Sequence, residues 1–276
     1  MKRSIGFVDY YISEWHANNY PEWIKQASKA VGEEFEVRYA WAERDDSLFD
    51  GATTEEWCEK FGVERCATIA ELCEKSDFIC ILAPSNPEKH LEYAREVLKC
   101  GKNTYIDKTF APDYATASEI FRLADEYGTK IFTTSALRYS TELEAFKGVS
   151  RVCTSGSGSN FEEYIIHQAE MVVKLLCSAP IGVIVEKTGD NEYVCEASFE
   201  GGGSATISYS PTMPFAIGKD FPNVEIVSDY FAALMVDILR FFITSNPSFD
   251  REETLFVMKL REALIRAKNT RERIEL

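Results

Sequence analysis

The fold is decided by the stretch Asp77-Phe78-Ile79-Cys80-Ile81-Leu82-Ala83-Pro84. Its apolar run does not alternate with polar residues, which predicts a strand that is buried on both faces, as in the middle of a parallel sheet. Pro84 closes the run, and residues 87–99 then follow a helical pattern that Gly101 ends. A buried strand followed by a helix predicts an α/β fold.

The alternation of strand and helix patterns continues on both sides of this stretch. Strands are predicted at 5–8, 36–42, 103–106 and 130–134, and helices at 21–30, from 53 to 62, from 68 onward and at 113–127. Two of these helices begin at Thr53 and Thr68, each at capping-box spacing before a glutamate. We therefore predict a Rossmann-type dinucleotide-binding domain, with a parallel doubly wound sheet, over residues 1–136.

The pattern changes after Arg138. In chain order the sequence predicts a small-residue loop, a helix, three strands and two helices, at 154–160, 161–176, 181–186, 192–199, 204–210, 227–242 and 251–268. Short turns between consecutive strands favour antiparallel pairing. Residues 137–276 are therefore predicted to form a smaller α+β domain for substrate binding and oligomerisation, with a mainly antiparallel open sheet.

Composition excludes several classes of protein. The net charge is −15, from 45 acidic and 30 basic residues, and such a surface repels nucleic acid and anionic membranes. No apolar stretch approaches the roughly 20 residues that span a bilayer, and the first residues lack a signal-peptide pattern. Eight cysteines without a Cys-x-x-Cys pair favour reduced thiols and no metal site, so we expect a cytoplasmic protein.

Ligands of open parallel sheets bind beyond the carboxyl ends of the strands. This rule brings residues 9–15, 83–87 and 107–112 around one predicted crevice. An aromatic cluster near it either stacks on a sugar or an adenine or forms a packed loop–helix core. The cluster consists of Tyr10, Tyr11, Trp15, Tyr20 and Trp23.

Three motifs follow one another after the buried strand. His90 lies six residues after Pro84, Gly101-Lys102 precedes the next strand, and Asp107-Lys108-Thr109 follows that strand. They resemble, in order, the motifs of the Gfo/Idh/MocA oxidoreductase family, which includes glucose–fructose oxidoreductase and inositol dehydrogenase. Arg138-Tyr139 and the Glu-x-x-x-His of residues 163–167 extend the resemblance, which covers most of the chain.

The resemblance implies an NAD(P)-dependent oxidoreductase that transfers hydride between a nicotinamide and a sugar, polyol or related hydroxy compound. It implies that Lys108 holds the substrate oxygen, that His167 moves its proton, and that Glu163, one helical turn earlier, orients His167. From spacing alone, an exposed loop lysine and a solvated helix pair are the commoner explanations of these residues.

The residues that the resemblance places around the cofactor come from several segments. They are Asp9, Tyr10, Tyr11, Ile12, Glu43, Ala83, Pro84, Ser85, His90, Asp107 and Lys108. Glu43, just past the second strand, is expected to bind the ribose hydroxyls and to favour NAD over NADP. Asp45 and Asp46 either share that role or face solvent. His90 is expected to anchor loops rather than to catalyse, and His16 to be structural.

The turn after the first strand departs from the family's Gly-x-Gly-x-x-Gly. Asp9, Tyr11 and Glu14 stand where the glycines belong, and two of them bring negative charge toward the diphosphate. A like-charge pair about 4 Å apart costs about 1 kcal/mol in water and about 4 kcal/mol at an effective dielectric of about 20. We therefore expect weak cofactor binding, unless the loop swings clear and backbone N–H groups or the hydroxyls of Tyr10 and Tyr11 hold the phosphates.

The second departure is length. Only 28 residues separate Arg138 from His167, so a strand or a substrate loop of the family is expected to be missing. Two other functions stay open: a cofactor-degenerate, non-catalytic protein that binds or regulates, and a structural subunit that pairs through its second sheet. An open apolar sheet face predicts a homodimer or homotetramer.

Overall fold

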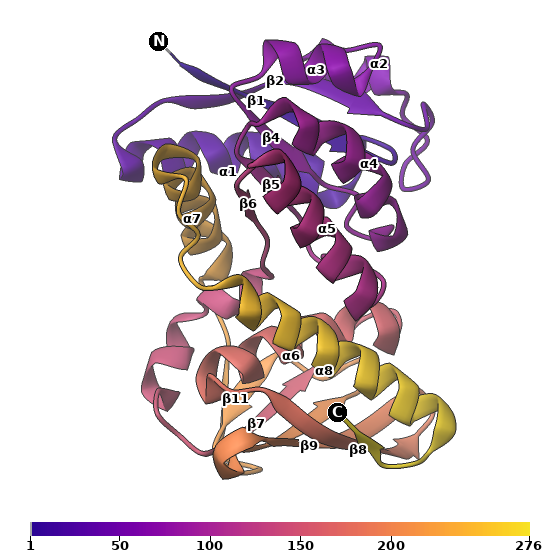
Figure 1. The fold of residues 1–276 in the computed structure, drawn as a ribbon. Helices are drawn as coiled ribbons and strands as arrows, with labels where there is room; N and C mark the ends of the chain where they lie inside the picture. Colours follow the sequence, from indigo (N-terminus) through magenta and orange to yellow (C-terminus); the bar gives the residue numbers. More distant parts are fainter. Residues whose placement is uncertain (1) are drawn as a thin grey trace. The chain divides into compact units, whose positions relative to one another are not determined.

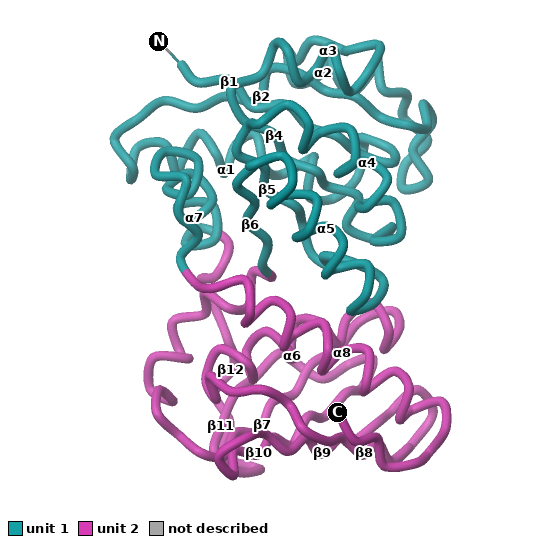
Figure 2. The backbone as a smooth tube through the Cα atoms, in the orientation of Figure 1, with its two compact units in different colours: residues 1–134, 232–248 teal, residues 135–231, 249–276 magenta. Residues whose placement is uncertain are grey.

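The structure is a computed structural model that describes residues 2–276, so Met1, the first residue of the predicted first domain, lies outside it. Two compact units are present (Figure 2). The first consists of the chain up to Thr134 together with Ala232–Ser248, and the second of Ser135–Phe231 and Phe249–Leu276.

The first unit is a parallel sheet with helices packed around it (Figure 1). Its strands pair in the order β3-β2-β1-β4-β5-β6 and are all parallel. They are β1 (Arg3–Asp9), β2 (Phe35–Ala42), β3 (Glu64–Arg65), β4 (Phe78–Ile81), β5 (Thr104–Ile106) and β6 (Ile131–Phe132). Between them run α1 (Trp15–Val31), α2 (Thr54–Phe61), α3 (Ile69–Lys75), α4 (His90–Val97) and α5 (Tyr114–Tyr127). This is the predicted doubly wound α/β fold.

The centre of this sheet is packed as the apolar run predicts. All four residues of β4 are buried. Its neighbour β1 contains Gly6, at which an added Cβ would lie 2.5 Å from Leu72 Cδ2 and 2.4 Å from Ser76 Oγ. Helix α3 therefore packs directly against the backbone of β1.

Helix ends follow the capping signals, with one exception. Thr53 caps α2 in a capping box with Glu56, and Thr68 caps α3, as predicted. The predicted start of the first helix near Pro21 is wrong, because α1 begins at Trp15 and contains Pro21. Glu14 is the N-cap of α1.

The second unit has a seven-stranded sheet in the order β12-β11-β7-β10-β9-β8-β13, in which only β7 and β10 pair in parallel among the described residues. Its elements are β7 (Arg151–Gly156), α6 (Phe161–Leu176), β8 (Pro180–Gly189), β9 (Glu192–Phe199), β10 (Ser204–Tyr209), β11 (Ala216–Gly218), β12 (Val224–Ile226), α8 (Arg251–Thr270) and β13 (Ile274–Glu275). The mainly antiparallel sheet of the prediction is confirmed.

The predicted loop at 154–160 is wrong over its first part, because β7 runs through it. The hydroxyls there find partners inside the unit. Thr154 Oγ1 donates to Gln168 Oε1 at 2.7 Å, and Ser155 Oγ donates to the Pro214 carbonyl at 2.8 Å. Small polar residues therefore occupy a strand where their sequence favoured a loop.

Helix α7 (Tyr230–Thr244) belongs mostly to the first unit, although the sequence division assigned it to the second domain. The Phe242 ring stacks on the Phe78 ring at 4.7 Å and 11°. Asn103 Nδ2 also donates to the Phe242 carbonyl at 3.1 Å. Apolar residues from the C-terminal part of the sequence thus complete the core of the first unit.

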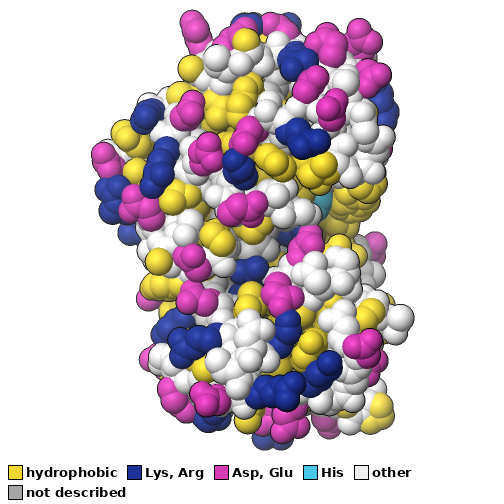
Figure 3. Space-filling view, turned by 90° about the vertical axis from the view of Figure 1, so that its right-hand side faces the viewer, with side chains coloured by type: hydrophobic (Ala, Val, Ile, Leu, Met, Phe, Trp, Pro, Cys, Tyr) yellow, Lys and Arg dark blue, Asp and Glu magenta, His cyan; other side chains and the backbone are white. Residues whose placement is uncertain are grey.

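On the face shown in Figure 3, acidic and basic side chains are interspersed rather than gathered by sign. No helix among residues 2–276 combines the length and apolar character that a membrane crossing requires. Six of the cysteine thiols are buried, and those of Cys100 and Cys177 are exposed.

Candidate functional site

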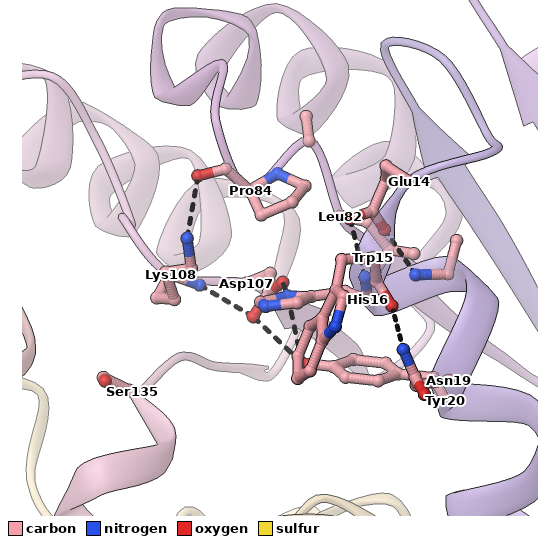
Figure 4. A network of polar contacts seen from close by, with 12 residues as sticks. Glu14, Trp15, His16, Asn19, Tyr20, Leu82, Pro84, Asp107, Lys108 and Ser135 are labelled. Atoms are coloured by element: carbon pink, nitrogen blue, oxygen red, sulfur yellow. Dashed lines mark hydrogen bonds and ion pairs between the residues drawn. The ribbon is translucent and has the colours of Figure 1, made fainter. Parts of the chain in front are cut away.

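Three segments meet at the carboxyl edge of the first sheet, as predicted (Figure 4). The Leu82 N–H donates to the Val8 carbonyl at 2.8 Å, and the Ala83 N–H donates to Asp9 Oδ1 at 3.0 Å. Lys108 Nζ donates to the Pro84 carbonyl at 3.3 Å. The ends of β1, β4 and β5 therefore form one polar cluster.

Glu14 caps helix α1. Its carboxylate accepts the N–H of His16 at 2.7 Å and the N–H of Ala17, and the residue is 5% exposed. Burial raises the pKa of Glu14, while the neighbouring His16 acts against that rise. The N–H groups that begin the helix thus already have an anionic acceptor from the chain itself.

Asp9 lies beneath this cap at the end of β1. Its carboxyl group accepts N–H groups from Tyr10, at 2.7 Å, and from Ala83. Asp9 Oδ2 has no hydrogen-bond partner anywhere in residues 2–276. Burial, followed by the charge of Glu14, raises the pKa of Asp9 well above its usual range.

A dinucleotide of a Rossmann fold places its diphosphate on the N–H groups at the start of the first helix, with glycines leaving room. Here those N–H groups bind Glu14, the Asp9 side chain is buried at the first glycine position, and Ile12 is 1% exposed. Tyr10 and Tyr11 place their rings edge to face at 5.8 Å. The turn as it stands does not fit a diphosphate.

Glu43, predicted to bind the ribose, is held by protein groups. Lys89 Nζ donates to its Oε1 at 2.7 Å, and the Tyr93 hydroxyl donates to its Oε2 at 2.7 Å. Partial burial alone would raise the pKa of Glu43, but these two donors lower it. A ribose would have to replace them.

Asp107 is 1% exposed, and its hydrogen-bond partners come from α1, from β5 and from Lys108 beside it. His16 Nδ1 contacts its Oδ2, and the hydroxyls of Tyr20 and Tyr105 donate to its Oδ1 at 3.2 and 3.1 Å. The Lys108 N–H donates to the same oxygen at 2.9 Å. Burial favours the neutral acid, yet His16 and Lys108 outweigh it and lower the pKa of Asp107.

Lys108 follows β5 and is half-buried, with its amino group on the Pro84 carbonyl. Ser85, which was expected near the cofactor, is exposed. His90 is fully buried, with Nδ1 at 3.0 Å from the Phe110 carbonyl and Nε2 at 2.6 Å from the Leu82 carbonyl. Burial lowers its pKa. His90 therefore ties two loops together, consistent with the anchoring role expected for it.

In the second unit, His167 lies half-buried on α6 and its Nδ1 is 2.6 Å from Ser135 Oγ. Asn160 caps this helix, accepting the Glu163 N–H at 2.8 Å and donating to Glu163 Oε2 at 3.1 Å. The rings of Tyr164 and Phe215 flank the imidazole at 5.9 and 5.6 Å. The orienting role of Glu163 stays a prediction, and Ser135 is a contact that the sequence did not suggest.

Arg138 contacts helix α6 at Glu170, three positions after His167. Its guanidinium contacts Glu170 at 3.3 Å and also Glu253, and stands 3.6 Å above the Phe249 ring. Burial raises the pKa of Glu170, and Arg138 opposes that rise. Arg138 therefore belongs to an internal ion cluster with Glu170 and Glu253.

Comparison with known proteins finds a family model that matches part of the chain. Residues 46–135 match the family model GFO_IDH_MocA, described as an oxidoreductase family with an NAD-binding Rossmann fold. Residues 46–135 are therefore similar to the Gfo/Idh/MocA oxidoreductase family, and the fold is that of its solved members. The match begins after the turn that holds Asp9 and Glu14, so it does not include the diphosphate position.

Individual relatives agree with the family. The chain is 33% identical over 61 residues to the uncharacterized oxidoreductase YhhX of Escherichia coli (strain K12), a match that spans 22% of this chain and only 18% of that relative. Two solved structures share its fold. One is myo-inositol dehydrogenase from Lactobacillus casei in complex with NAD(H) and myo-inositol (TM-score 0.78, 11% identity, 100% of this chain and 97% of that one). The other is aldose-aldose oxidoreductase from Caulobacter crescentus (TM-score 0.72, 13% identity, 100% of both chains).

The sequence analysis missed the contacts of two residues at these sites. His16 was expected to be structural, and its contact with Asp107 spans 91 positions of the chain. Ser135 lies 32 positions from His167. Ser135 comes soon after β6, and His16 lies in the first turn of α1, the helix that follows β1. Ligands of parallel sheets bind beyond the strand ends, and that rule is the signal that could have found both residues.

Proposed function

We propose that this chain is an oxidoreductase for a sugar, polyol or related hydroxy compound, and that it binds its nicotinamide dinucleotide weakly, NAD in preference to NADP. The family supports this proposal, since its model is described as an NAD-binding oxidoreductase. The observation that carries it is Lys108, a half-buried residue that follows β5 and whose amino group donates to the Pro84 carbonyl.

The proposed chemistry gives each residue one task. The Lys108 ammonium donates to the substrate oxygen and polarises it, and His167 accepts the hydroxyl proton, with Glu163 orienting the ring. No side chain can accept hydride, so the activity requires a nicotinamide. Because the turn at Asp9 and Glu14 does not fit a diphosphate as it stands, we assign no further step to the cofactor.

Weak cofactor binding follows from what must be displaced. Releasing an N-cap carboxylate costs about 1 kcal/mol in helix stability, and each 1.4 kcal/mol lowers affinity about tenfold. The preference for NAD rests on Glu43, whose negative charge would repel the extra phosphate of NADP. Both effects act before any chemistry begins.

The test begins with a screen of sugars and polyols for reduction of NAD and NADP by the purified protein. With a substrate in hand, Lys108→Met should lower kcat about 10²–10³-fold, as for loss of one donor to the reacting oxygen. His167→Ala should lower kcat about 10²–10⁴-fold and leave cofactor affinity nearly unchanged. Full turnover by either variant would refute its assigned role.

The second candidate is a non-catalytic member that binds a hydroxy compound without a dinucleotide. The Glu14 cap favours this candidate, because Glu14 already accepts the N–H groups to which a diphosphate would bind. Calorimetric titration of myo-inositol with and without NAD separates the two candidates. Binding that is independent of NAD, with no turnover in the screen, would support the second.

A further inference from the structure

The start of α1 is more than a poor site for an anion, since it already holds one. We propose that the Glu14 carboxylate is a built-in occupant of the diphosphate position, and that a dinucleotide binds only by displacing it. This inference rests on the proposed function and concerns the regulation of that same site. It concerns the Glu14 side chain and the backbone N–H groups of His16 and Ala17, which donate hydrogen bonds to it.

The helix start is the natural place for such a competitor. An α-helix carries about half a positive charge at its N-terminus, together with N–H groups that have no partner within the helix. Glu14 satisfies the N–H groups of His16 and Ala17 while 5% exposed, so this charge-assisted contact is shielded from water. A diphosphate would seek the same donors.

Asp9 is the second, independent observation. Its carboxyl group lies at the end of β1, is 1% exposed, and leaves Oδ2 without a partner in the described chain. A buried polar atom without a partner is rare and needs an explanation. Asp9 and Glu14 are two acidic residues in one turn, so the turn disfavours the binding of a further anion. A diphosphate therefore binds there only after Glu14 has left.

The experiment removes the competitor and keeps the helix. Serine is itself a good N-cap, so Glu14→Ser leaves α1 capped without the long carboxylate. Glu14→Gln keeps the shape and removes the charge. Asp113→Ser is the matched control, because Asp113 caps α5, another helix of the first unit. It accepts the Thr116 N–H at 2.7 Å. Circular dichroism and thermal melting establish that each variant is folded.

Two probes are titrated calorimetrically against each protein: NADH, and inorganic diphosphate, which needs no nucleotide pocket. We expect weak binding of both to the native chain, about fivefold tighter binding to Glu14→Ser, a smaller gain in Glu14→Gln, and no change in Asp113→Ser. The intermediate result is expected because a neutral amide oxygen competes less well for the N–H groups.

Three outcomes overturn the inference: low-micromolar binding of NADH by the native chain, no gain for either probe in Glu14→Ser and Glu14→Gln, or an equal gain in Asp113→Ser. A gain for diphosphate without a gain for NADH would uphold the Glu14 competitor and defeat the proposed use of a dinucleotide. The two proposals can therefore fail separately.

Discussion

Asp107 is a buried carboxylate, and its charge is stabilised by the groups that contact it. Its folded-state pKa lies below the ordinary value, so the charged form stabilises the fold above the unfolded pKa, and that stability is lost as pH falls through the folded pKa. Asp107→Asn breaks the contact with His16 and should cost about 3 kcal/mol at neutral pH, as for a broken buried pair. Urea unfolding across the acid range measures this.

The control is Asp113→Asn, since asparagine caps a helix as well as aspartate does. The difference between the native chain and Asp107→Asn should shrink as the solution becomes acidic, while the control stays near zero. A difference that grows toward low pH would contradict the charged state assigned to Asp107.

Asp9 makes the opposite prediction. Its folded-state pKa is raised, so its contribution to stability is fully present below the unfolded pKa and is lost as pH rises through the folded pKa. Asp9→Asn stays neutral and keeps an oxygen for the N–H groups of Tyr10 and Ala83. The variant should unfold at higher urea than the native chain in alkaline solution, with the advantage fading in acid. An advantage that does not change with pH would reject this explanation.

Ser135 is expected to position His167. Its Oγ lies 2.6 Å from Nδ1, so the hydroxyl holds the imidazole ring in one orientation. The chain has only three histidines, so their ring ¹⁵N resonances can be assigned by substitution. Ser135→Ala should change the ring ¹⁵N resonances of His167, and Ser135→Thr, which keeps a hydroxyl, should restore the native spectrum. An unchanged spectrum in Ser135→Ala would remove this role.

At this scale the sequence predicted less than at any other. It placed Lys108 and Asp9 at the sheet edge, because strand ends follow from apolar runs. It could not foresee that Glu14 folds back onto the helix start or that Glu43 is held by Lys89, since those contacts depend on side-chain direction. Pairs far apart in the chain, such as His16 with Asp107, leave no local pattern.

At the scale of elements, β1 and α3 pack against each other at Gly6, which has no side chain. Gly6→Ala should destabilise the first unit by about 1–3 kcal/mol, because the new methyl group overlaps Leu72 and Ser76. The same substitution should cost less in a Leu72→Ala background, where space is available. Urea unfolding of the four proteins measures the coupling, and equal costs in both backgrounds would exclude the clash.

Capped helices and buried strands were predicted well, because their signals are local. Helix α6 has the predicted bounds, and Thr53 forms the expected capping box. The short strands β3, β11, β12 and β13 were missed, since two or three residues carry no periodicity. Strand β7 was missed because the sheet, and not its own residues, determines its conformation.

For the whole molecule, the two-part architecture follows from the order of the predicted strands and helices, and the family resemblance follows from the order of the motifs. The oligomeric state stays a prediction of a homodimer or homotetramer through the face of the second sheet that carries Ile184, Val194 and Thr206, all half-buried. Light scattering at micromolar concentration checks it. Lys substitutions at Ile184 and Val194 should yield monomers, and a native monomer would end the proposal.

Helix α7 has a consequence for how the chain is made. Because Ala232–Ser248 belongs to the first unit, that unit lacks part of its core until the ribosome has passed residue 248. At about 5–20 residues per second, the nascent sheet waits several seconds or more with Phe78 uncovered. Chaperones that bind apolar surface have their opportunity in that interval. Cutting the gene after residue 134 would make the interval permanent, whereas joining residues 230–248 to that fragment should end it.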